Sequence, residues 1–145
     1  MSHVHLEARL DAPADDLYVA AKDFSAYRQW MRDVRSLAVV ESGPSWQVTE
    51  WEVTWLGQIY GWRERDAFDD EARTIRSTLV ESRFLDQLEL VCRFDSEEAG
   101  TKLTADMTFG VRFAGQVIEM LAPSLIRRNF ASLSEGLRRR VSTPA

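Results

Sequence analysis

Residues 49–68, TEWEVTWLGQIYGWRERDAF, predict two neighbouring β-strands whose shared face mixes aromatic and acidic side chains. Side chains two positions apart lie on the same face of a strand. Before the break at Gly57 this spacing groups Trp51, Val53 and Trp55, and after it Tyr60, Trp62, Glu64, Asp66 and Phe68. The mixture leaves three interpretations of this face open: a packed core, a ligand pocket or an active site.

The period-two pattern extends beyond this stretch and predicts six consecutive strands. They cover residues 34–41, 46–56, 59–68, 73–81, 85–95 and 102–113. The breaks between them are short and rich in turn-forming residues, which favours hairpins and therefore an antiparallel meander.

Ahead of the meander, the pattern predicts one strand and two short helices. Residues 3–11 alternate apolar and polar side chains, as in a half-buried strand. Residues 11–23 and 25–34 are the predicted helices, with Pro13 at the first helical position of one and Ser25 as the N-cap of the other.

A long helix is predicted over residues 115–141, and Pro123 should kink it or split off a short leading turn. Its apolar stripe contains Ile126, Phe130, Leu133, Leu137 and Val141. A second stripe beside it holds smaller and more polar residues: Leu125, Asn129, Ser132 and Gly136. Such residues leave room next to the helix for another molecule, although they also permit close helix–sheet contact.

The order of elements predicts a single α+β domain spanning residues 1–145. In chain order it comprises a strand, two short helices, a six-stranded antiparallel meander and a long C-terminal helix. We expect this helix to pack across the curved sheet, because the apolar face of the sheet must be covered. A curved sheet around one helix generally encloses a cavity, which is a usual place for a ligand.

The composition restricts the function. A net charge of −5 argues against DNA binding, which requires a basic surface. Cys92 is the one cysteine, so no intramolecular disulfide forms, and the strand pattern makes it an inward-facing small apolar residue. His3 and His5 should point to solvent and lack a third ligand nearby, so we expect no metal and no cofactor.

Neither a secretory signal nor a stretch long enough for stable membrane insertion is evident in the sequence. We therefore expect a cytoplasmic protein. Its oligomeric state is left open between monomer and homodimer.

Four segments stand out in the chain: LDAPADDLYVAAKDFSAYRQWM at 10–31, GWRERDAFDD at 61–70, RTIRSTL at 73–79 and SLIRRNFASLSEGLRRRV at 124–141. In this order they resemble the START-like (SRPBCC) superfamily of helix-grip proteins. The nearest groups are the bacterial coenzyme Q-binding proteins and the polyketide cyclases and aromatases. The resemblance implies a helix-grip fold with a cavity for an apolar or aromatic molecule between the sheet and the last helix. It does not by itself imply a reaction.

The polyketide aromatases, as the resemblance implies, carry tryptophan, serine and arginine on one central strand facing the pocket. In this chain Trp62 matches the tryptophan, whereas Glu64 and Asp66 replace the serine and the arginine. The tyrosine position falls near Val34, and Asn129 matches an asparagine of the last helix. The aromatic residue of this strand is therefore the same as in the aromatases, whereas their polar catalytic residues are replaced.

Glu64 and Asp66 have two interpretations. Their α-carbons lie about 7 Å apart along one face, and burial of one of them would raise its pKa enough for general acid–base chemistry. Glu64, Asp66 and Asn129 are the catalytic candidates on that interpretation. The favoured alternative is that both acids pair with Arg93 or Arg112 across the sheet, at a wet pocket mouth.

We therefore expect a non-catalytic protein that binds or carries a hydrophobic small molecule such as a quinone, lipid, isoprenoid or polyketide-like aromatic. A polyketide cyclase or dehydratase is the first alternative. The expected ligand-binding residues are Tyr27, Trp30, Trp51, Trp55, Tyr60, Trp62, Glu64, Asp66, Leu90, Cys92, Leu125, Asn129 and Ser132.

A ribosome- or protein-interaction module is the second alternative, because some coenzyme Q-binding relatives are described as acting on ribosomes. Its surface would be the arginines at 127–128 and 138–140. Three arginines at a helix C-terminus also suit the negative end of the helix dipole, which is the simpler explanation of 138–140.

Overall fold

The computed structural model describes residues 1–112 and 115–142 and has the element order expected from the sequence. Each expected strand end among the described residues lies within two residues of the observed one, and the expected end at residue 113 lies outside the described residues. The elements are β1 (Ser2–Leu10), α1 (Ala14–Ala21), the 3-10 turn η1 (Phe24–Ala26), α2 (Tyr27–Trp30), β2 (Val34–Ser42), β3 (Trp46–Trp55), β4 (Gln58–Asp69), β5 (Thr74–Ser82), β6 (Leu85–Glu97), β7 (Gly100–Val111) and α3 (Gly115–Ser142).

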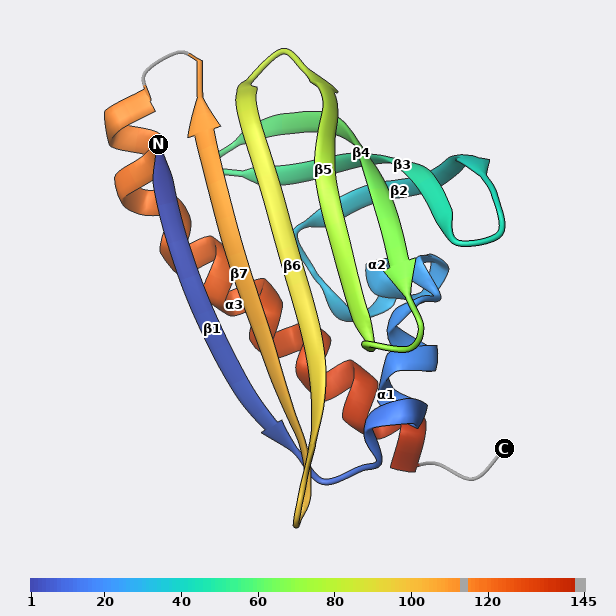
Figure 1. The fold of residues 1–145 in the computed structure, drawn as a ribbon. Coiled ribbons are helices and arrows are strands. Elements are labelled where there is room, and N and C mark those ends of the chain that lie inside the picture. Colours follow the sequence, from blue (N-terminus) through green and yellow to red (C-terminus); the bar gives the residue numbers. More distant parts are fainter. Residues whose placement is uncertain (113–114, 143–145) are drawn as a thin grey trace.

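The strands form one antiparallel sheet in the order β1-β7-β6-β5-β4-β3-β2. β2 to β7 are consecutive neighbours, and β1 joins the free side of β7, so the predicted meander is confirmed. The sheet bends so that β2, β3 and β4 turn away from β1, β7 and β6, and α3 lies behind the sheet along its inner face (Figure 1). The α+β helix-grip fold expected from the sequence is therefore confirmed.

The hairpin between β3 and β4 fixes the register of the central strands. Its turn residues Leu56 and Gly57 have φ values of 51° and 76°, the positive values that a tight two-residue hairpin requires. Strand pairing starting from this turn places Trp51 opposite Trp62 and Gln47 opposite Asp66. The opening stretch of sequence thus forms two directly paired strands.

The ladder between β5 and β6 is short. It runs only from Thr74–Arg93 to Thr78–Glu89, whereas β5 stays paired with β4 as far as Ser82. The pairing between the two halves of the sheet therefore stops at Thr78.

Two local expectations need correction. Pro13 is the residue before α1, whose first helical residue is Ala14. Ser25 lies inside η1 and donates its hydroxyl to Asp23, and it does not cap the second helix. α3 continues as one helix through Pro123, so of the two expected effects of this proline the split-off leading turn does not occur and the kink stays a prediction.

α1, η1 and α2 cover one end of the sheet and meet α3 there. Leu17, Phe94, Leu103 and Leu137 are almost completely buried in this layer. The small residue Gly136 has a definite role, because a Cβ at this position would lie 2.2 Å from the Trp30 ring. In the described part of the chain, no helix is long and apolar enough to cross a membrane.

Candidate functional site

A cavity of about 260 Å³ lies between the inner face of the sheet and α3. This volume is close to the lower end of the range that is typical of small-molecule sites. The wall contains ten of the thirteen expected ligand-binding residues: Tyr27, Trp51, Trp55, Tyr60, Trp62, Glu64, Leu90, Cys92, Leu125 and Asn129. Trp30, Asp66 and Ser132 are not on the wall.

Aromatic rings form one side of the cavity. Trp51 and Trp62 are a directly opposed pair on β3 and β4, and their rings stack with a centroid separation of 5.5 Å and an interplanar angle of 9°. Phe24 meets the edge of Trp51 at 6.1 Å and stacks on Tyr27 at 4.4 Å. These contacts hold flat apolar surfaces against the cavity at low conformational freedom.

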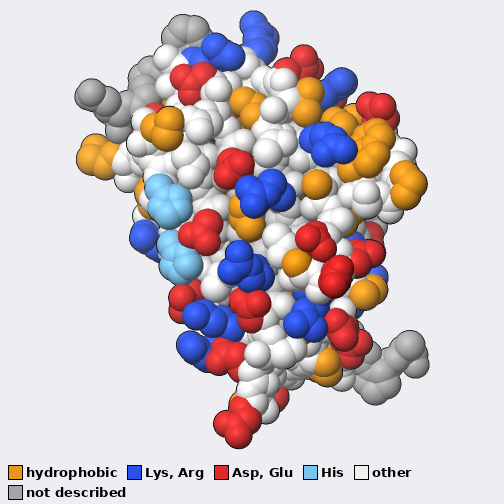
Figure 2. Space-filling model, in the orientation of Figure 1, with side chains coloured by type: hydrophobic (Ala, Val, Ile, Leu, Met, Phe, Trp, Pro, Cys, Tyr) orange, Lys and Arg blue, Asp and Glu red, His pale blue; other side chains and the backbone are white. Residues whose placement is uncertain are grey.

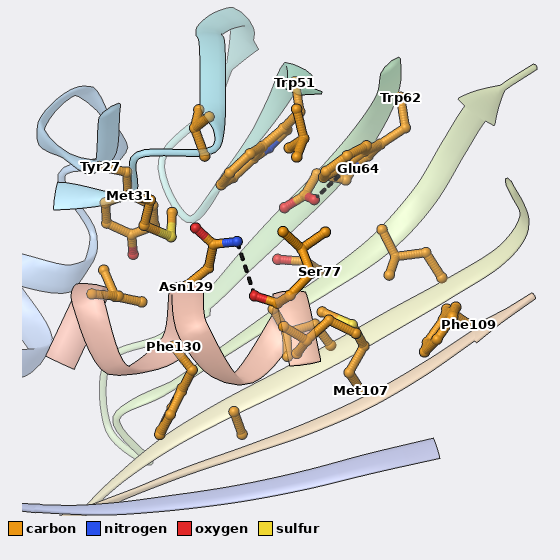
Figure 3. Close-up of a pocket in the computed structure, with 18 of the residues that line it drawn as sticks. Tyr27, Met31, Trp51, Trp62, Glu64, Ser77, Met107, Phe109, Asn129 and Phe130 are labelled. Atoms are coloured by element: carbon orange, nitrogen blue, oxygen red, sulfur yellow. Dashed lines mark hydrogen bonds between the residues drawn. The ribbon is translucent and has the colours of Figure 1, made fainter. Parts of the chain in front are cut away.

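Glu64 brings a carboxyl group into this apolar wall. It follows Trp62 by two residues on β4, and the Trp62 indole Nε1 donates to Glu64 Oε1 at 2.7 Å (Figure 3). Only 4 % of Glu64 is exposed. The alternation of β4 therefore places an acid beside the aromatic pair, as the sequence predicted.

Asp66 lies behind this wall and is fully buried. Thr49 and Gln47 on β3 donate to its Oδ2 at 2.8 and 3.2 Å, and Ser77 on β5 donates to its Oδ1 at 2.7 Å. A carboxylate surrounded by three donors is well satisfied in the interior. Asp66 thus acts as the centre of a network that spans β3, β4 and β5.

The two acids are coupled. Burial raises the pKa of Glu64 well above its ordinary value, and the hydrogen bond and negative charge of Asp66 raise it further. The hydrogen bonds from Trp62 and Ser77 act in the opposite direction, but more weakly. Glu64 therefore keeps its proton to a higher pH than an ordinary glutamic acid, next to an acid that is held by neutral donors.

The expected pairing of these acids with arginine at a wet mouth is wrong. Glu64 and Asp66 are buried, whereas Arg93 and Arg112 are exposed. Arg93 lies next to the buried Phe94 in β6 and so points to the opposite face of the sheet. The alternation of side chains predicted the correct face of the sheet for the two acids. It did not predict that, among the described residues, arginine side chains are absent from their surroundings on that face.

Asn129 faces Glu64 from α3, with Ser77 between them on the sheet side (Figure 3). Its Nδ2 donates to Asp33 Oδ2 at 3.1 Å and to the Leu125 carbonyl at 3.0 Å. Arg128 holds the same Asp33 oxygen at 2.7 Å. Both neighbours of Nδ2 are acceptors, which fixes the orientation of the Asn129 amide.

Two further titratable groups line the cavity near Glu64. Burial, followed by the charge of Glu64, raises the pKa of the Cys92 thiol to about 12. Burial likewise raises the pKa of Tyr27, whose hydroxyl donates to the Ala21 carbonyl. Cys92 is therefore a neutral, unreactive thiol near neutral pH, as expected for a small apolar residue.

Ser77 was missed by the sequence interpretation, as were Gln47 and Thr49. They are polar residues on the inner face of strands, and each belongs to the same network around Asp66. Their alternation with Ile75, Trp51 and Val53 was a readable signal. The alternation does not reveal which residues of the neighbouring strands lie beside each acid.

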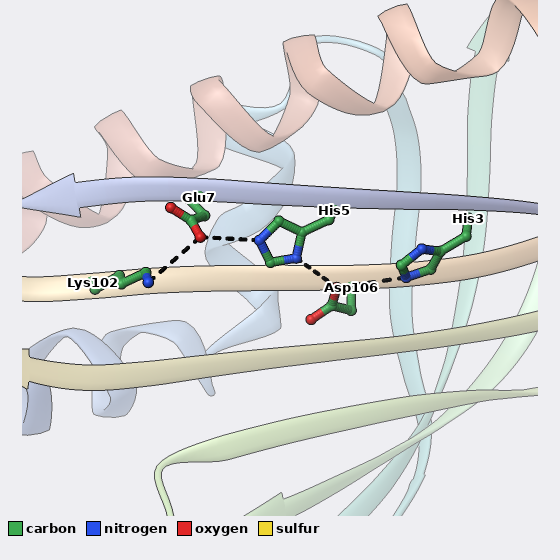
Figure 4. Close-up of polar contacts among 5 residues, drawn as sticks. All are labelled: His3, His5, Glu7, Lys102 and Asp106. Atoms are coloured by element: carbon green, nitrogen blue, oxygen red, sulfur yellow. Dashed lines mark hydrogen bonds and ion pairs between the residues drawn. The ribbon is translucent and has the colours of Figure 1, made fainter.

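The outer face of the sheet carries interspersed acidic and basic side chains (Figure 2). His3 and His5 are exposed there, and His5 Nδ1 lies 2.6 Å from Asp106 Oδ1 while Nε2 lies 3.1 Å from Glu7 (Figure 4). These hydrogen bonds raise the pKa of His5. Among the described residues, no group of three or more potential ligands is placed to hold a metal.

Several arginines of α3 form ion pairs with acids. Arg128 pairs with Asp33 at 2.7 Å, Arg138 with Glu135 at 2.6 Å and Arg140 with Asp23 at 2.9 Å. Two of these pairs tie α3 to segments near α2 and η1. A ribosome or protein partner at these arginines stays a prediction.

Solved structures share this architecture. A protein of Thermus thermophilus, TTHA0849, is 27% identical with a TM-score of 0.87, and the match covers 97% of both chains. The Zhui aromatase/cyclase from Streptomyces sp. R1128 is 20% identical with a TM-score of 0.83, covering 97% of this chain and 93% of that one. A START superfamily protein from Mycobacterium smegmatis is 19% identical with a TM-score of 0.76, covering 96% of each.

No curated protein matches the chain significantly. The likeness to the last two structures shows the fold alone, because sequence identity is low. The family model described as polyketide cyclase / dehydrase and lipid transport matches residues 10–138. The START-like resemblance is thereby confirmed, and the chain belongs to the polyketide cyclase / dehydrase and lipid transport family.

Proposed function

We propose that this protein binds and carries an uncharged, ring-bearing hydrophobic molecule in the cavity between the sheet and α3, without transforming it. The observation that carries the proposal is the pair of stacked rings Trp51 and Trp62, which present flat apolar surface to an enclosed space of about 260 Å³. An aromatic or fused-ring ligand would stack against this surface and lose its contact with water.

The polar groups of the cavity support a carrier better than an enzyme. An enolate formed during an aldol condensation requires a nearby cation or a set of free donors. No lysine, arginine or histidine is among the described residues of the wall. Asp66, behind the wall, would add a negative charge near any such enolate.

One observation favours the cyclase or dehydratase alternative. Glu64 is a buried acid on the cavity wall with a raised pKa, and such a group is suited to general acid catalysis. The two functions differ in what Glu64→Gln does, because glutamine keeps the size and the acceptor oxygen but cannot transfer a proton.

Native mass spectrometry of the protein purified from its own host tests for a carried ligand. We expect a reproducible co-purified mass, and the isolated ligand should quench tryptophan fluorescence when it is added back. Prolonged incubation should leave its mass unchanged, and Glu64→Gln should still bind it. A ligand consumed by the wild type and not by Glu64→Gln would contradict the carrier proposal and favour the enzyme.

A matched pair of variants locates the binding. Ala122 is buried and lines the cavity from α3, whereas Ala131 is exposed on the same helix. Naphthalene serves as a minimal ring-bearing probe. Ala122→Phe should fill part of the cavity and weaken naphthalene binding at least ten-fold, and Ala131→Phe should leave it unchanged. Equal affinities in both variants would place the binding site elsewhere.

A further inference from the structure

We infer that the cavity selects a ring compound carrying a hydroxyl hydrogen-bond donor, in preference to one carrying only a carbonyl or a carboxylate. The inference rests on the proposed function and adds the chemical class of the polar end of the ligand. It is based on the hydrogen bonds of Glu64, Ser77 and Asn129, whose polar hydrogen atoms already have acceptors within the protein.

The donors at this end of the cavity are committed to protein acceptors. The Trp62 indole N–H goes to Glu64, and the Ser77 hydroxyl goes to Asp66. The two amide hydrogens of Asn129 serve Asp33 and the Leu125 carbonyl. Each of these bonds is 3.1 Å or shorter, so a ligand acceptor would have to displace a formed bond.

The proton of Glu64 also has an acceptor within the protein. Its Oε1 accepts from Trp62, so the proton of the neutral acid belongs on the other oxygen. Its hydrogen bond with the Asp66 carboxyl group gives that proton an acceptor within the protein. A ligand carbonyl is a weaker acceptor than a carboxylate and would not compete for the proton.

At the end of the cavity formed by Glu64, Ser77 and Asn129, lone pairs are what remain for a ligand. Asn129 offers Oδ1, since both of its amide hydrogens are bonded, and Ser77 keeps the lone pairs of its Oγ. Both residues line the cavity, Ser77 on the side of Glu64 and the Asn129 oxygen on the side of Tyr27 and Met31 (Figure 3). A hydroxyl placed there donates to one of these oxygens without disturbing the network around Asp66.

The charges around the cavity further restrict the class of ligand that fits. The described residues of the wall include no cationic side chain, so a carboxylate ligand would be buried unpaired near Asp66. A cationic ligand would not be paired with Asp66 either, because Gln47, Thr49 and Ser77 already donate hydrogen bonds to its carboxyl group. An uncharged hydroxyl is therefore the polar group that fits, as in a phenol, a ring alcohol or a hydroquinone.

A series of naphthalene compounds tests this by tryptophan quenching and calorimetry on the wild-type protein. One added hydrogen bond should make 2-naphthol bind on the order of ten-fold more tightly than naphthalene. 2-Methoxynaphthalene keeps the ring and the oxygen but lacks the donor, so it should lose this gain. 1,4-Naphthoquinone should bind no better than naphthalene, and 2-naphthoate should bind least.

Asn129→Leu provides the second test. It should remove most of the preference for 2-naphthol over naphthalene, measured as the ratio of the two affinities in the same variant. An unchanged preference would overturn the assignment to Asn129. If naphthalene binds but the quinone or the methyl ether equals 2-naphthol in the wild type, the donor rule is wrong and the carrier proposal stands. If none of these ring compounds binds, the proposed function fails instead.

Discussion

Glu64→Gln should stabilise this protein, and the gain should grow with pH. Glu64 is 4 % exposed, and its pKa is raised in the folded state by burial and by Asp66. Above its ordinary pKa of 4.5 the unfolded chain loses this proton while the folded protein keeps it. Ionisation then favours the unfolded state, so wild-type stability falls as pH rises from 4.5 towards the folded-state pKa.

The magnitude follows from proton linkage. Each pH unit in that window removes about 1.4 kcal/mol from the free energy of unfolding of the wild type. Glutamine has no proton to lose, keeps an acceptor for Trp62 and adds an amide donor for Asp66. For a domain of this size, the difference in Tm between Glu64→Gln and wild type should therefore increase by roughly 5 °C per pH unit.

Thermal unfolding followed by circular dichroism at pH 5, 6, 7 and 8 measures this slope. Glu81→Gln is the matched control, because the side chain of Glu81 lies on β5 and is 70 % exposed. We expect the control to change Tm only slightly at each pH. A Tm difference for Glu64→Gln that stays constant across the series would show that Glu64 does not hold its proton in the fold, and the reasoning from burial would be refuted.

Three more predictions concern the same core. Asp66→Ala should lower the free energy of unfolding by on the order of 3 kcal/mol in urea titrations, because buried donors such as Ser77 lose their acceptor; a loss under about 1 kcal/mol would contradict this. Gly136→Ala should destabilise by about 1–3 kcal/mol, since its Cβ meets the Trp30 ring; helix propensity alone predicts a gain instead. Cys92, with its pKa raised to about 12, should react with a disulfide reagent at pH 8 far more slowly in the folded than in the urea-unfolded protein.

The sheet was predictable because its signals are local. Alternation of apolar side chains, interrupted at turns such as Gly43–Pro44 and Gly57, determines where each strand begins and ends. Ser25 shows the limit of local reasoning. Its side-chain oxygen could accept the N-cap hydrogen bond, but the chain already turns into η1 at Phe24, so Ser25 lies inside that turn and its hydroxyl donates to Asp23.

The surroundings of the acids were not predictable in the same way. Alternation correctly indicated the face of Glu64 and Asp66, but their partners depend on strand register across two ladders. The turn at Leu56–Gly57 did carry that information for β3, since pairing outward from it brings Gln47 opposite Asp66. Leucine is a poor residue for the positive φ of such a turn, so little in the sequence favoured this register over its neighbours.

Glu64 is a buried acid that lowers the stability of the fold near neutral pH, which is typical of residues with a functional role. The fold does not need an ionisable group at position 64, because a glutamine would satisfy Trp62 equally well. Positions where a residue weakens the folded state without structural gain tend to lie at binding and catalytic sites. Glu64 meets this description and lies on the cavity wall. On the proposed function, the proton of Glu64 would spare a bound ligand a second negative charge while Asp66 keeps the nearby donors occupied. Ligand binding should then raise Tm more in the wild type than in Glu64→Leu.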